Sequence, residues 1–398
     1  MKKNVSSKIS NVLKYRLSPW LKSQIDSLSQ SIYSDLGLEI NGEKAPRALF
    51  IFPTVSFDFY IQGRFEEGLK TKMHNIYFQG LAILKKLIDH GYVVDCVDKD
   101  AFDVNRDTSQ YRLIIDEGNN LAFLSNYPNQ KKIFYSTGLK WERRNLNEQQ
   151  RINWFHDAYG FFVKPVRQSL PVYSSQVADF ILYKGVPEQM QDFNKRAKLV
   201  QLAMPVEYEP ENIERDYSKR EFLWIGGWGA IHKGLDIVVE AFEGMPESKL
   251  HIFGPLEREG KVLNWLQDKL KGSKNVFYQG FADYTKSSFQ KIIHNCAGHI
   301  YPSAGENGCA TLAQTAHYGL IPVTTAEANN QASFLGYNIE GDSRSLMIES
   351  IRHSVAEISA MDDETLKTKS EKIMAFAKER FTRSAFLKSV DDFLLSVK

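Results

Sequence analysis

Short apolar runs alternate with amphipathic segments along most of the chain, beginning near residue 47. The run Ala48–Phe52 predicts a buried strand, and Ile76–His90 has the spacing of an amphipathic helix, with Gly91 at a typical C-cap position. Further strands are predicted at Tyr92–Val97, Leu113–Ile115 and Lys132–Tyr135. Strands that alternate with helices favour a parallel sheet covered on both faces.

A second cycle follows the proline-bearing stretch Met204–Pro210, which is the predicted interdomain linker. The pattern predicts strands at Phe222–Ile225, Leu250–Phe253, His299–Tyr301 and Ile321–Thr324, and helices at Leu235–Phe242, Val262–Leu270 and from about Cys309. Two such cycles indicate an α/β protein with two doubly wound, Rossmann-like domains facing a cleft. In such sheets ligands bind beyond the carboxyl ends of the strands.

Residues 1–40 precede the first cycle and have apolar positions at helical spacing on both sides of Pro19. Up to Lys22 this segment holds six basic residues and no acidic one. A basic amphipathic helix there lies either on an anionic membrane surface or, as we favour, against the body of the protein. The predicted divisions are a helical extension (1–40), an N-terminal domain (41–205), a C-terminal domain (206–378) and a last helix (379–398) that returns toward the N-terminal domain.

The composition argues against several classes of protein, among them nucleic-acid binders and membrane-spanning proteins. The chain has 50 Lys and Arg against 48 Asp and Glu, and this balance argues against a dedicated nucleic-acid binder. The three cysteines are far apart and form no CxxC, so neither a disulfide framework nor a zinc site is expected. No apolar run approaches the ~18 residues of a membrane span, and no secretory signal is evident. We therefore expect a cytoplasmic protein, with contact to the inner face of the membrane through residues 1–22 left open.

The most informative segment runs from Ile300 to Gln314. A strand enters a tight loop that opens a helix, and the free N–H groups at such a helix start favour anions such as a diphosphate. Glu306 stands in this loop, where its carboxylate can accept hydrogen bonds from sugar hydroxyls. Gln314 lies about two turns further on, and its amide can hold another hydroxyl pair.

A second informative segment is Phe222–Asp236. It consists of a predicted strand, a glycine-rich loop and a Lys233-Gly234 pair at the start of a predicted helix. A lysine beside exposed backbone amides suits phosphate oxygens. Two other nucleotide-binding motifs do not fit this segment. Lys233-Gly234 is the reverse of the Gly-Lys order in a Walker motif, and Gly227-x-Gly229 lacks the third glycine of a dinucleotide fingerprint.

Together, in this order, the two segments resemble the C-terminal domain of the family-four (group one) retaining glycosyltransferases, which have the GT-B fold. The matching pieces between and after them are Leu250–Gly254, Asn275–Phe281 and the helix start Arg380–Phe386. The resemblance covers roughly residues 220–390. It implies a nucleotide-sugar donor, a saccharide or lipid-linked acceptor, no cofactor and no metal requirement.

The resemblance also assigns roles. Lys233 would neutralise the donor diphosphate and Glu306 would contact the transferred sugar, so these two are the catalytic candidates. The backbone amides of Asn307, Gly308 and Cys309 would hold phosphate or sugar oxygens, and position 314 would meet the ribose. The remaining donor-binding candidates are the glycines and aromatics of the neighbouring strand ends: Gly227, Trp228, Gly229, Gly254, Gly280 and Phe281.

The chain departs from the family in three places. Gln314 stands where a second glutamate is usual, and Gly227 or Trp228 stands where an arginine often follows the strand glycine. The N-terminal half matches less well, because a strand that commonly leads to a histidine here runs into Ser136-Thr137-Gly138. Thr137, Gly138 and Arg64, in the loop that follows the first strand, are the acceptor-side candidates.

Several other polar or aromatic residues have either a functional or a purely structural interpretation. A set of basic residues forms either an acceptor-side patch or a solvated face: Lys140, Arg143, Arg144, Arg151, Lys164 and Arg167. We favour a structural role for the adjacent His156 and Asp157, a polar loop rather than a metal site for Asp98-Lys99-Asp100, and ordinary packing for Trp141, Trp154 and Trp265.

The sequence therefore predicts sugar transfer from a UDP- or GDP-sugar to an acceptor hydroxyl, with retention of configuration, in the synthesis of a cell-surface glycan or lipid-linked saccharide. One alternative is a GT-B epimerase, which would need no acceptor, or a phosphorylase, for which the lysine context is missing. The other is a catalytically degenerate scaffold or nucleotide-sugar-binding subunit, which the three departures favour.

Overall fold

The computed structural model describes residues 32–55, 57–69, 75–211 and 213–397. The predicted basic helix within residues 1–22 lies outside this part of the chain. Contacts divide the protein into two compact units, one ending at Ile133 and one formed by Phe134–Val397. The second unit thus begins before the predicted linker Met204–Pro210, whose residues are irregular in structure.

The first unit holds four strands in the order β1-β3-β2-β4 and the start of a fifth. Strand β2 is parallel to β3 and β4, whereas β1 is antiparallel to β3. The segment Ile32–Leu36 was expected to be helical and instead forms β1, because Tyr33 is buried beside β3 while Ile32 is exposed. The elements are β1 (Ile32–Leu36), α3 (Leu38–Asn41), β2 (Arg47–Ile51), α4 (Asp58–Ile61), α5 (Phe65–Leu69), α6 (Asn75–Asp89), β3 (Val93–Val97) and β4 (Tyr111–Asp116).

Helix α6 forms where the amphipathic pattern predicted it and buries its apolar face. Gly91, with φ of +90°, then reverses the chain into β3, which only a glycine does without strain.

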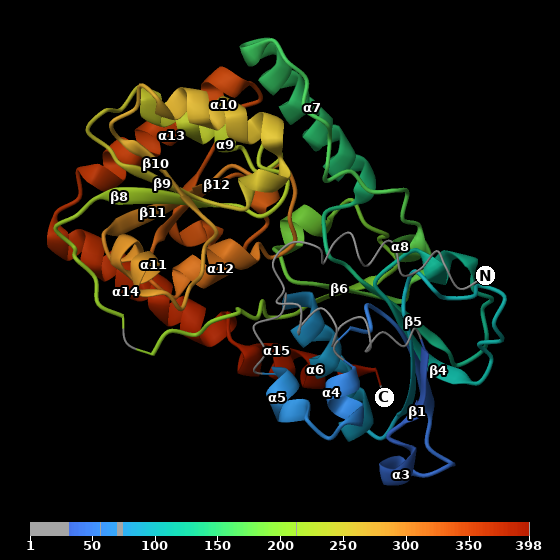
Figure 1. Ribbon diagram of the computed structural model, residues 1–398. Coiled ribbons are helices and arrows are strands. Elements are labelled where there is room, and N and C mark those ends of the chain that lie inside the picture. The colour runs from blue at the N-terminus through green and yellow to red at the C-terminus, as the bar shows by residue number, and fades with distance from the viewer. Residues whose placement is uncertain (1–31, 56, 70–74, 212, 398) are drawn as a thin grey trace. The chain divides into compact units, whose positions relative to one another are not determined.

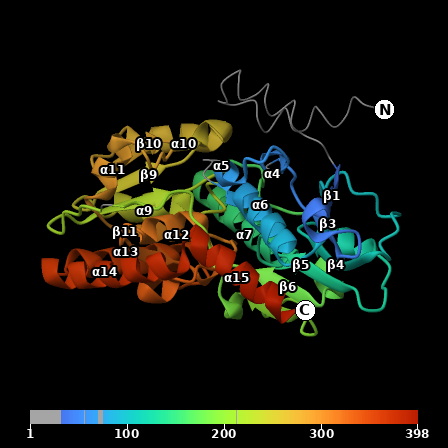
Figure 2. The same cartoon turned by 90° about the horizontal axis from the view of Figure 1, so that it is seen from below.

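The second unit begins with elements that mostly escaped prediction: β5 (Lys131–Tyr135) crosses the division, and it is followed by α7 (Trp141–Tyr159), α8 (Ser174–Val177), β6 (Phe180–Tyr183) and β7 (Lys198–Gln201). Strands β6 and β7 are parallel. Helix α15 (Arg383–Ser396) packs against this part, since Phe393 meets Phe180 edge-to-face and Ser389 accepts the amide of Ala203. Only two residues separate α15 from α14 (Asp363–Arg380) (Figure 2).

A six-stranded parallel sheet forms the core of the second unit, in the order β10-β9-β8-β11-β12-β13. This is the strand order of a dinucleotide-type Rossmann domain, with its switch point between β8 and β11. Helices α9, α10 and α13 cover one face, and α11, α12 and α14 the other (Figure 1). The bounds are β8 (Glu221–Ile225), α9 (Leu235–Glu243), β9 (Leu250–Phe253), α10 (Gly260–Leu270), β10 (Val276–Gly280), α11 (Ser287–Ile293), β11 (Cys296–Tyr301), α12 (Ala310–Ala316), β12 (Ile321–Thr324), β13 (Tyr337–Asn338) and α13 (Arg344–Ser359).

Candidate functional site

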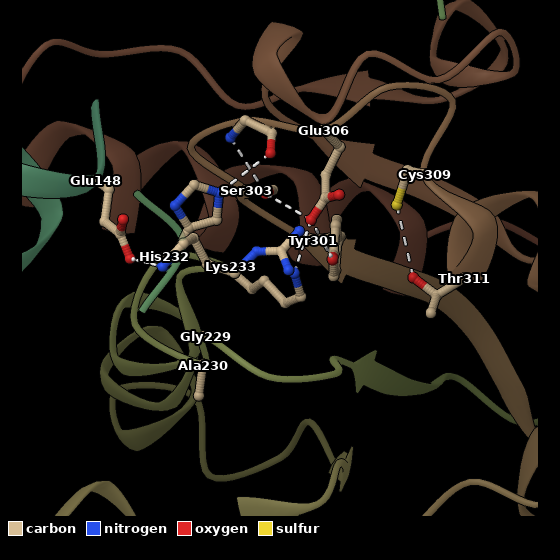
Figure 3. A network of polar contacts seen from close by, with 12 residues as sticks. Glu148, Gly229, Ala230, His232, Lys233, Tyr301, Ser303, Glu306, Cys309 and Thr311 are labelled. Carbon is tan, nitrogen blue, oxygen red and sulfur yellow. Dashed lines mark hydrogen bonds and ion pairs between the residues drawn. The ribbon is translucent and has the colours of Figure 1, made fainter. Parts of the chain in front are cut away.

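An ion pair joins the two loops that leave β8 and β11 at the switch point of the sheet. Lys233, in the turn after β8, donates from Nζ to Oε1 of Glu306, in the loop after β11, at 2.7 Å (Figure 3). Both side chains are largely withdrawn from water, at 7% and 16% exposure. The structure therefore brings together the two residues that the sequence proposed for chemistry, 73 positions apart.

Glu306 collects its protein contacts on one oxygen. Oε1 also accepts from the hydroxyl groups of Tyr301, at 3.2 Å, and Ser303, at 3.5 Å. Burial alone would raise the pKa of this carboxyl, but the charges of Lys233 and Arg167 outweigh it and hold the pKa below the ordinary value. Within the described residues no donor reaches Oε2. The arrangement leaves an ionised carboxylate with one oxygen available to a ligand hydroxyl.

The turn that carries Lys233 is fixed by close packing against the Glu306 loop. Gly234 has φ of +71°, and a Cβ there would stand 2.5 Å from Pro302 Cγ and 2.7 Å from its carbonyl oxygen. The indole of Trp224 donates to the carbonyl of Lys233 at 3.1 Å. A glycine is therefore required at position 234 for the loops to approach.

His232 connects the same two loops and is neutral. Its Nε2 lies 3.1 Å from the carbonyl oxygen of Gly305, which can only accept, so Nε2 carries the proton. Its own carbonyl accepts the amide of Ala304 at 2.8 Å. Burial and the neighbouring Lys233 lower the pKa of His232 to about 3. This histidine was not singled out from the sequence, where nothing distinguishes it from an ordinary polar neighbour of the lysine.

Asn307 fastens the Glu306 loop to the ends of β5 and β6. Its Oδ1 accepts the amides of Lys184 and Gly185, each at 2.9 Å, and its Nδ2 donates to the carbonyl of Ser136 at 2.8 Å. The neighbouring amide of Gly308 donates to the carbonyl of Asn329 at 2.9 Å. The side chain of Asn307 thus has a structural task, and the Gly308 amide is already bonded. Cys309 is buried, and burial together with Glu306 raises the pKa of its thiol to about 12.

The side chain of Gln314 is hydrogen-bonded to the segment that connects β7 to β8. Its Oε1 accepts the amide of Tyr208 at 3.0 Å, and its Nε2 donates to the carbonyl of the same residue at 2.5 Å. The side chain is buried at 2% exposure. Both groups that were expected to meet a ribose are therefore engaged by the Met204–Pro210 segment. A glutamate could not make both bonds, since a carboxylate has no donor.

Gln314→Glu is accordingly expected to destabilise the protein rather than restore a missing carboxylate. The substitution turns the bond to the Tyr208 carbonyl into a repulsive contact of two acceptors in a buried site, at a cost of about 1–3 kcal/mol. Urea unfolding followed by circular dichroism measures the change. A Gln314→Glu protein as stable as the wild type, or one with higher activity, would contradict this account.

The glycine loop after β8 is partly occupied by the protein itself. The carboxylate of Glu259 accepts the amide of Gly229 at 2.7 Å and that of Ala230 at 3.2 Å, so these amides are not open to a phosphate here. Gly227 has open space around it, and Trp228 is 49% exposed. The unshielded part of this loop is therefore at Gly227 and Trp228.

Three of the predicted donor-binding residues, Gly254, Gly280 and Phe281, lie at the ends of β9 and β10. The amide of Gly254 donates to the carbonyl of Gly280 at 2.8 Å, and a Cβ on Gly254 would come within 2.7 Å of the Gly226 carbonyl oxygen. Phe281, next in the chain, is 69% exposed. An exposed phenyl ring beyond the carboxyl end of a strand is suited to stack on a planar ligand.

The acceptor-side candidates fall in different units. Arg64 lies in the first unit and is bound to Glu67, over the ring of Phe59. Thr137 and Gly138 follow β5 in the second unit. A Cβ on Gly138 would stand 3.2 Å from Nη1 of Arg144, so this turn borders the arginine.

The basic set of α7 does not form one solvated face. Arg143 pairs with Glu327 at 2.8 Å and Asp192 at 3.5 Å, and Arg151 is buried over the ring of Trp154. Arg167 instead lowers the pKa values of the paired Lys233 and Glu306, and the charge of Glu306 opposes the lowering of the pKa of Arg144 by burial. The sequence named both arginines without linking them to that pair, because their approach depends on contacts between distant segments.

The residues for which the sequence favoured a structural role make local contacts or lie at the surface. His156 and Asp157 are exposed near the end of α7, and Trp265 packs edge-to-face on Phe155. Asp98 accepts the amide of Asp100 at 3.0 Å and so forms a polar turn. Over the described residues, no three His, Cys, Asp or Glu side chains gather as a metal site requires.

In the part of the chain that the structure describes, no helix combines the length and the apolar character needed to cross a bilayer. A pocket of about 530 Å³ opens beside α7, α9 and α13, lined by residues that include Trp154, Glu240 and Arg344. Lys233 and Glu306 are not among its lining residues, so this pocket is separate from the ion pair.

No protein-family model and no curated protein sequence matches this chain. Solved structures do match its fold. Sucrose-phosphate synthase from Thermosynechococcus elongatus matches with a TM-score of 0.55 over 89% of this chain and 99% of that chain, at 11% identity. HepE from Anabaena, in complex with UDP and glucose, matches with a TM-score of 0.53 over 88% and 100%, at 12% identity.

Staphylococcus aureus TarM, in complex with UDP and other ligands, matches over 80% of this chain with a TM-score of 0.47 and 14% identity. The chain spans 59% of the length of TarM. With the strand order and the paired α/β sheets described above, the full-length matches establish the architecture. The protein has the α/β GT-B fold, with two Rossmann-like domains.

Proposed function

We propose that this protein is a metal-independent retaining glycosyltransferase that uses a UDP- or GDP-sugar. The observation that carries the proposal is the buried Lys233–Glu306 pair, with Glu306 Oε2 open, at the switch point of the second sheet. Ligands of Rossmann-like sheets bind at this position. HepE shares the fold, and its structure contains UDP and glucose. This supports a nucleotide sugar as the ligand of the present protein.

The residues suit departure of a nucleoside diphosphate. During transfer, the bond between the sugar anomeric carbon and the diphosphate oxygen breaks, and its electron pair stays on that oxygen. The acceptor hydroxyl oxygen bonds to the anomeric carbon on the same face, and its proton leaves with the diphosphate. Lys233 stabilises the developing negative charge, and Glu306 holds sugar hydroxyls. A fixed ammonium in a water-poor site performs the task for which other transferases use a divalent cation.

The acceptor is proposed by class only. A saccharide or lipid-linked saccharide of a growing cell-surface glycan fits a protein whose first 22 residues carry six basic groups and no acid. Binding of that segment to the inner face of the membrane would place the site near such an acceptor.

A second candidate function, a scaffold that binds nucleotide sugars without turnover, is favoured by specific contacts. Tyr208 engages Gln314, and Glu259 occupies the amides of Gly229 and Ala230. These groups are withdrawn from any donor in this structure.

A calorimetric titration separates the possibilities. Purified protein in EDTA is titrated with UDP-, GDP-, ADP- and CDP-sugars, and the series is repeated on Lys233→Ala. We expect selective binding of one UDP- or GDP-sugar, weakened in the variant. Binding of none would refute the transferase and leave a scaffold without a nucleotide ligand, whereas binding without product formation over a broad acceptor screen would favour the nucleotide-binding scaffold.

A further inference from the structure

Two arginines beside the Lys233–Glu306 pair have guanidinium groups without a protein acceptor. Arg144 lies on α7, and Arg167 follows that helix; neither guanidinium makes a hydrogen bond or an ion pair with the residues that the structure describes. The Nε atom of each is shielded from water. Burial, followed by the charge of Arg167, lowers the pKa of Arg144. Shielded cationic donors without acceptors are costly and call for an anionic ligand.

The backbone around Arg167 is fastened to α7. Glu148 accepts the amides of Val166 and Arg167 through one oxygen, at 2.9 and 2.7 Å. Asn145 and Ser169 exchange two hydrogen bonds, at 2.8 and 2.9 Å. These hydrogen bonds to α7 fix the position of the irregular segment that carries Arg167.

Both arginine stems reach the loops of the ion pair. A Cβ on Gly229 would come within 2.5 Å of Arg167 Cγ, so the missing side chain leaves the path of the arginine clear. A Cβ on Gly305 would stand 3.6 Å from Arg144 Cγ, beside Glu306 in the chain. Arg167 also contributes to the low pKa of Glu306 and lowers that of Lys233. Arg167 therefore lies close enough to Lys233 and Glu306 for its charge to act on both, and Arg144 lies close enough to Glu306 for the carboxylate charge to act on its guanidinium.

The nearby carboxylates do not satisfy these arginines. Oε1 of Glu306 is bonded to Lys233, Oε1 of Glu148 accepts two backbone amides, and Glu259 accepts the amides of Gly229 and Ala230. The second oxygens of Glu306 and Glu148 accept no hydrogen bond from the described residues, and neither forms an ion pair with an arginine. The donors of Arg144 and Arg167 remain open, and a planar guanidinium binds phosphate oxygens in pairs. A diphosphate supplies enough acceptors for both.

We propose that Arg144 and Arg167 bind the diphosphate of the donor from the α7 side, opposite the turn that carries Lys233. The assignment rests on the proposed function for the identity of the ligand. A phosphate group on the acceptor has the same chemistry, and binding of UDP in the absence of acceptor distinguishes the two sources.

The test compares dissociation constants of UDP, uridine and inorganic pyrophosphate for the wild type, Arg144→Gln and Arg167→Gln. Arg143→Gln is the matched control, because it removes the same charge from the same helix at a residue already paired with Glu327. We expect each test substitution to weaken UDP and pyrophosphate about 10- to 100-fold and to leave uridine unchanged. Arg143→Gln should retain wild-type affinity for UDP.

Thermal unfolding accompanies each titration. A purely structural role predicts lower melting temperatures in Arg144→Gln and Arg167→Gln, whereas unpaired cations predict little change. Should either variant fail to fold, Arg144→Lys and Arg167→Lys keep the charge, and we expect them to weaken UDP by a smaller factor.

The outcomes separate the two proposals. Wild-type affinity for UDP and pyrophosphate in both arginine variants would overturn the arginine assignment and leave the proposed function standing. A wild type that binds pyrophosphate, loses it in the variants and binds no nucleotide would keep the anion site and remove the proposed function.

Discussion

Lys233→Ala is expected to lower the rate of sugar transfer by about 10²- to 10³-fold. The lysine is a buried cation bonded to the carboxylate that keeps an open oxygen, and the negative charge on the diphosphate increases as the diphosphate leaves. Because that interaction strengthens in the transition state, most of the loss should appear in kcat and less in KM for the donor. Release of nucleoside diphosphate from the bound nucleotide sugar, with acceptor present, measures the rate.

Lys249→Ala is the matched control for this substitution. Lys249 precedes β9 and bonds to Glu221 at the start of β8, so this pair lies at the amino ends of the strands, away from the loops that carry Lys233 and Glu306. It is 55% exposed, so its removal should change neither the rate nor the fold. Lys233→Ala with a wild-type kcat would exclude the lysine from the chemistry.

Asn307→Ala is expected to lower the free energy of unfolding by about 2–5 kcal/mol. The substitution leaves the buried amides of Lys184 and Gly185 without an acceptor and removes the donor to Ser136. Each orphaned amide loses its bond and cannot turn to water. Urea denaturation measures the change.

Asn153→Ala provides the comparison. Asn153 is exposed on α7, and its side chain bonds only to Gln149 within the described part of the chain, so we expect a change within about 0.5 kcal/mol. If Asn307→Ala is as stable as Asn153→Ala, the side chain of Asn307 does not hold the Glu306 loop to the strand ends.

The second sheet was predictable because its strands are short, mostly apolar runs, and β8 and β9 are each followed directly by a glycine. Strands β9 and β12 have the expected bounds, and β8 begins only one residue earlier than predicted. The long helix α7 escaped notice because few of its residues are apolar and only four are buried. Tertiary contacts rather than a strong amphipathic pattern hold it in place.

Of the candidate site, only the proximity of Lys233 and Glu306 followed from the order of motifs in the sequence. Lys233 and Glu306 stand at strand ends, and parallel strands bring their ends together. Gln314 was assigned to a ribose because its partner, Tyr208, lies 106 positions away and no local signal links them. Arg167 depends in the same way on a distant residue, Gly229, where a Cβ would come within 2.5 Å of its Cγ.

The most direct measurement is a crystal structure of the full chain soaked with saturating UDP in the absence of metal. The account predicts density for the diphosphate within hydrogen-bonding distance of Lys233 Nζ, with the nucleotide beyond the carboxyl ends of β8 and β11. Density in the separate pocket beside α7 and α13, or no nucleotide at saturation, would contradict the assignment of the Lys233–Glu306 pair as the donor site.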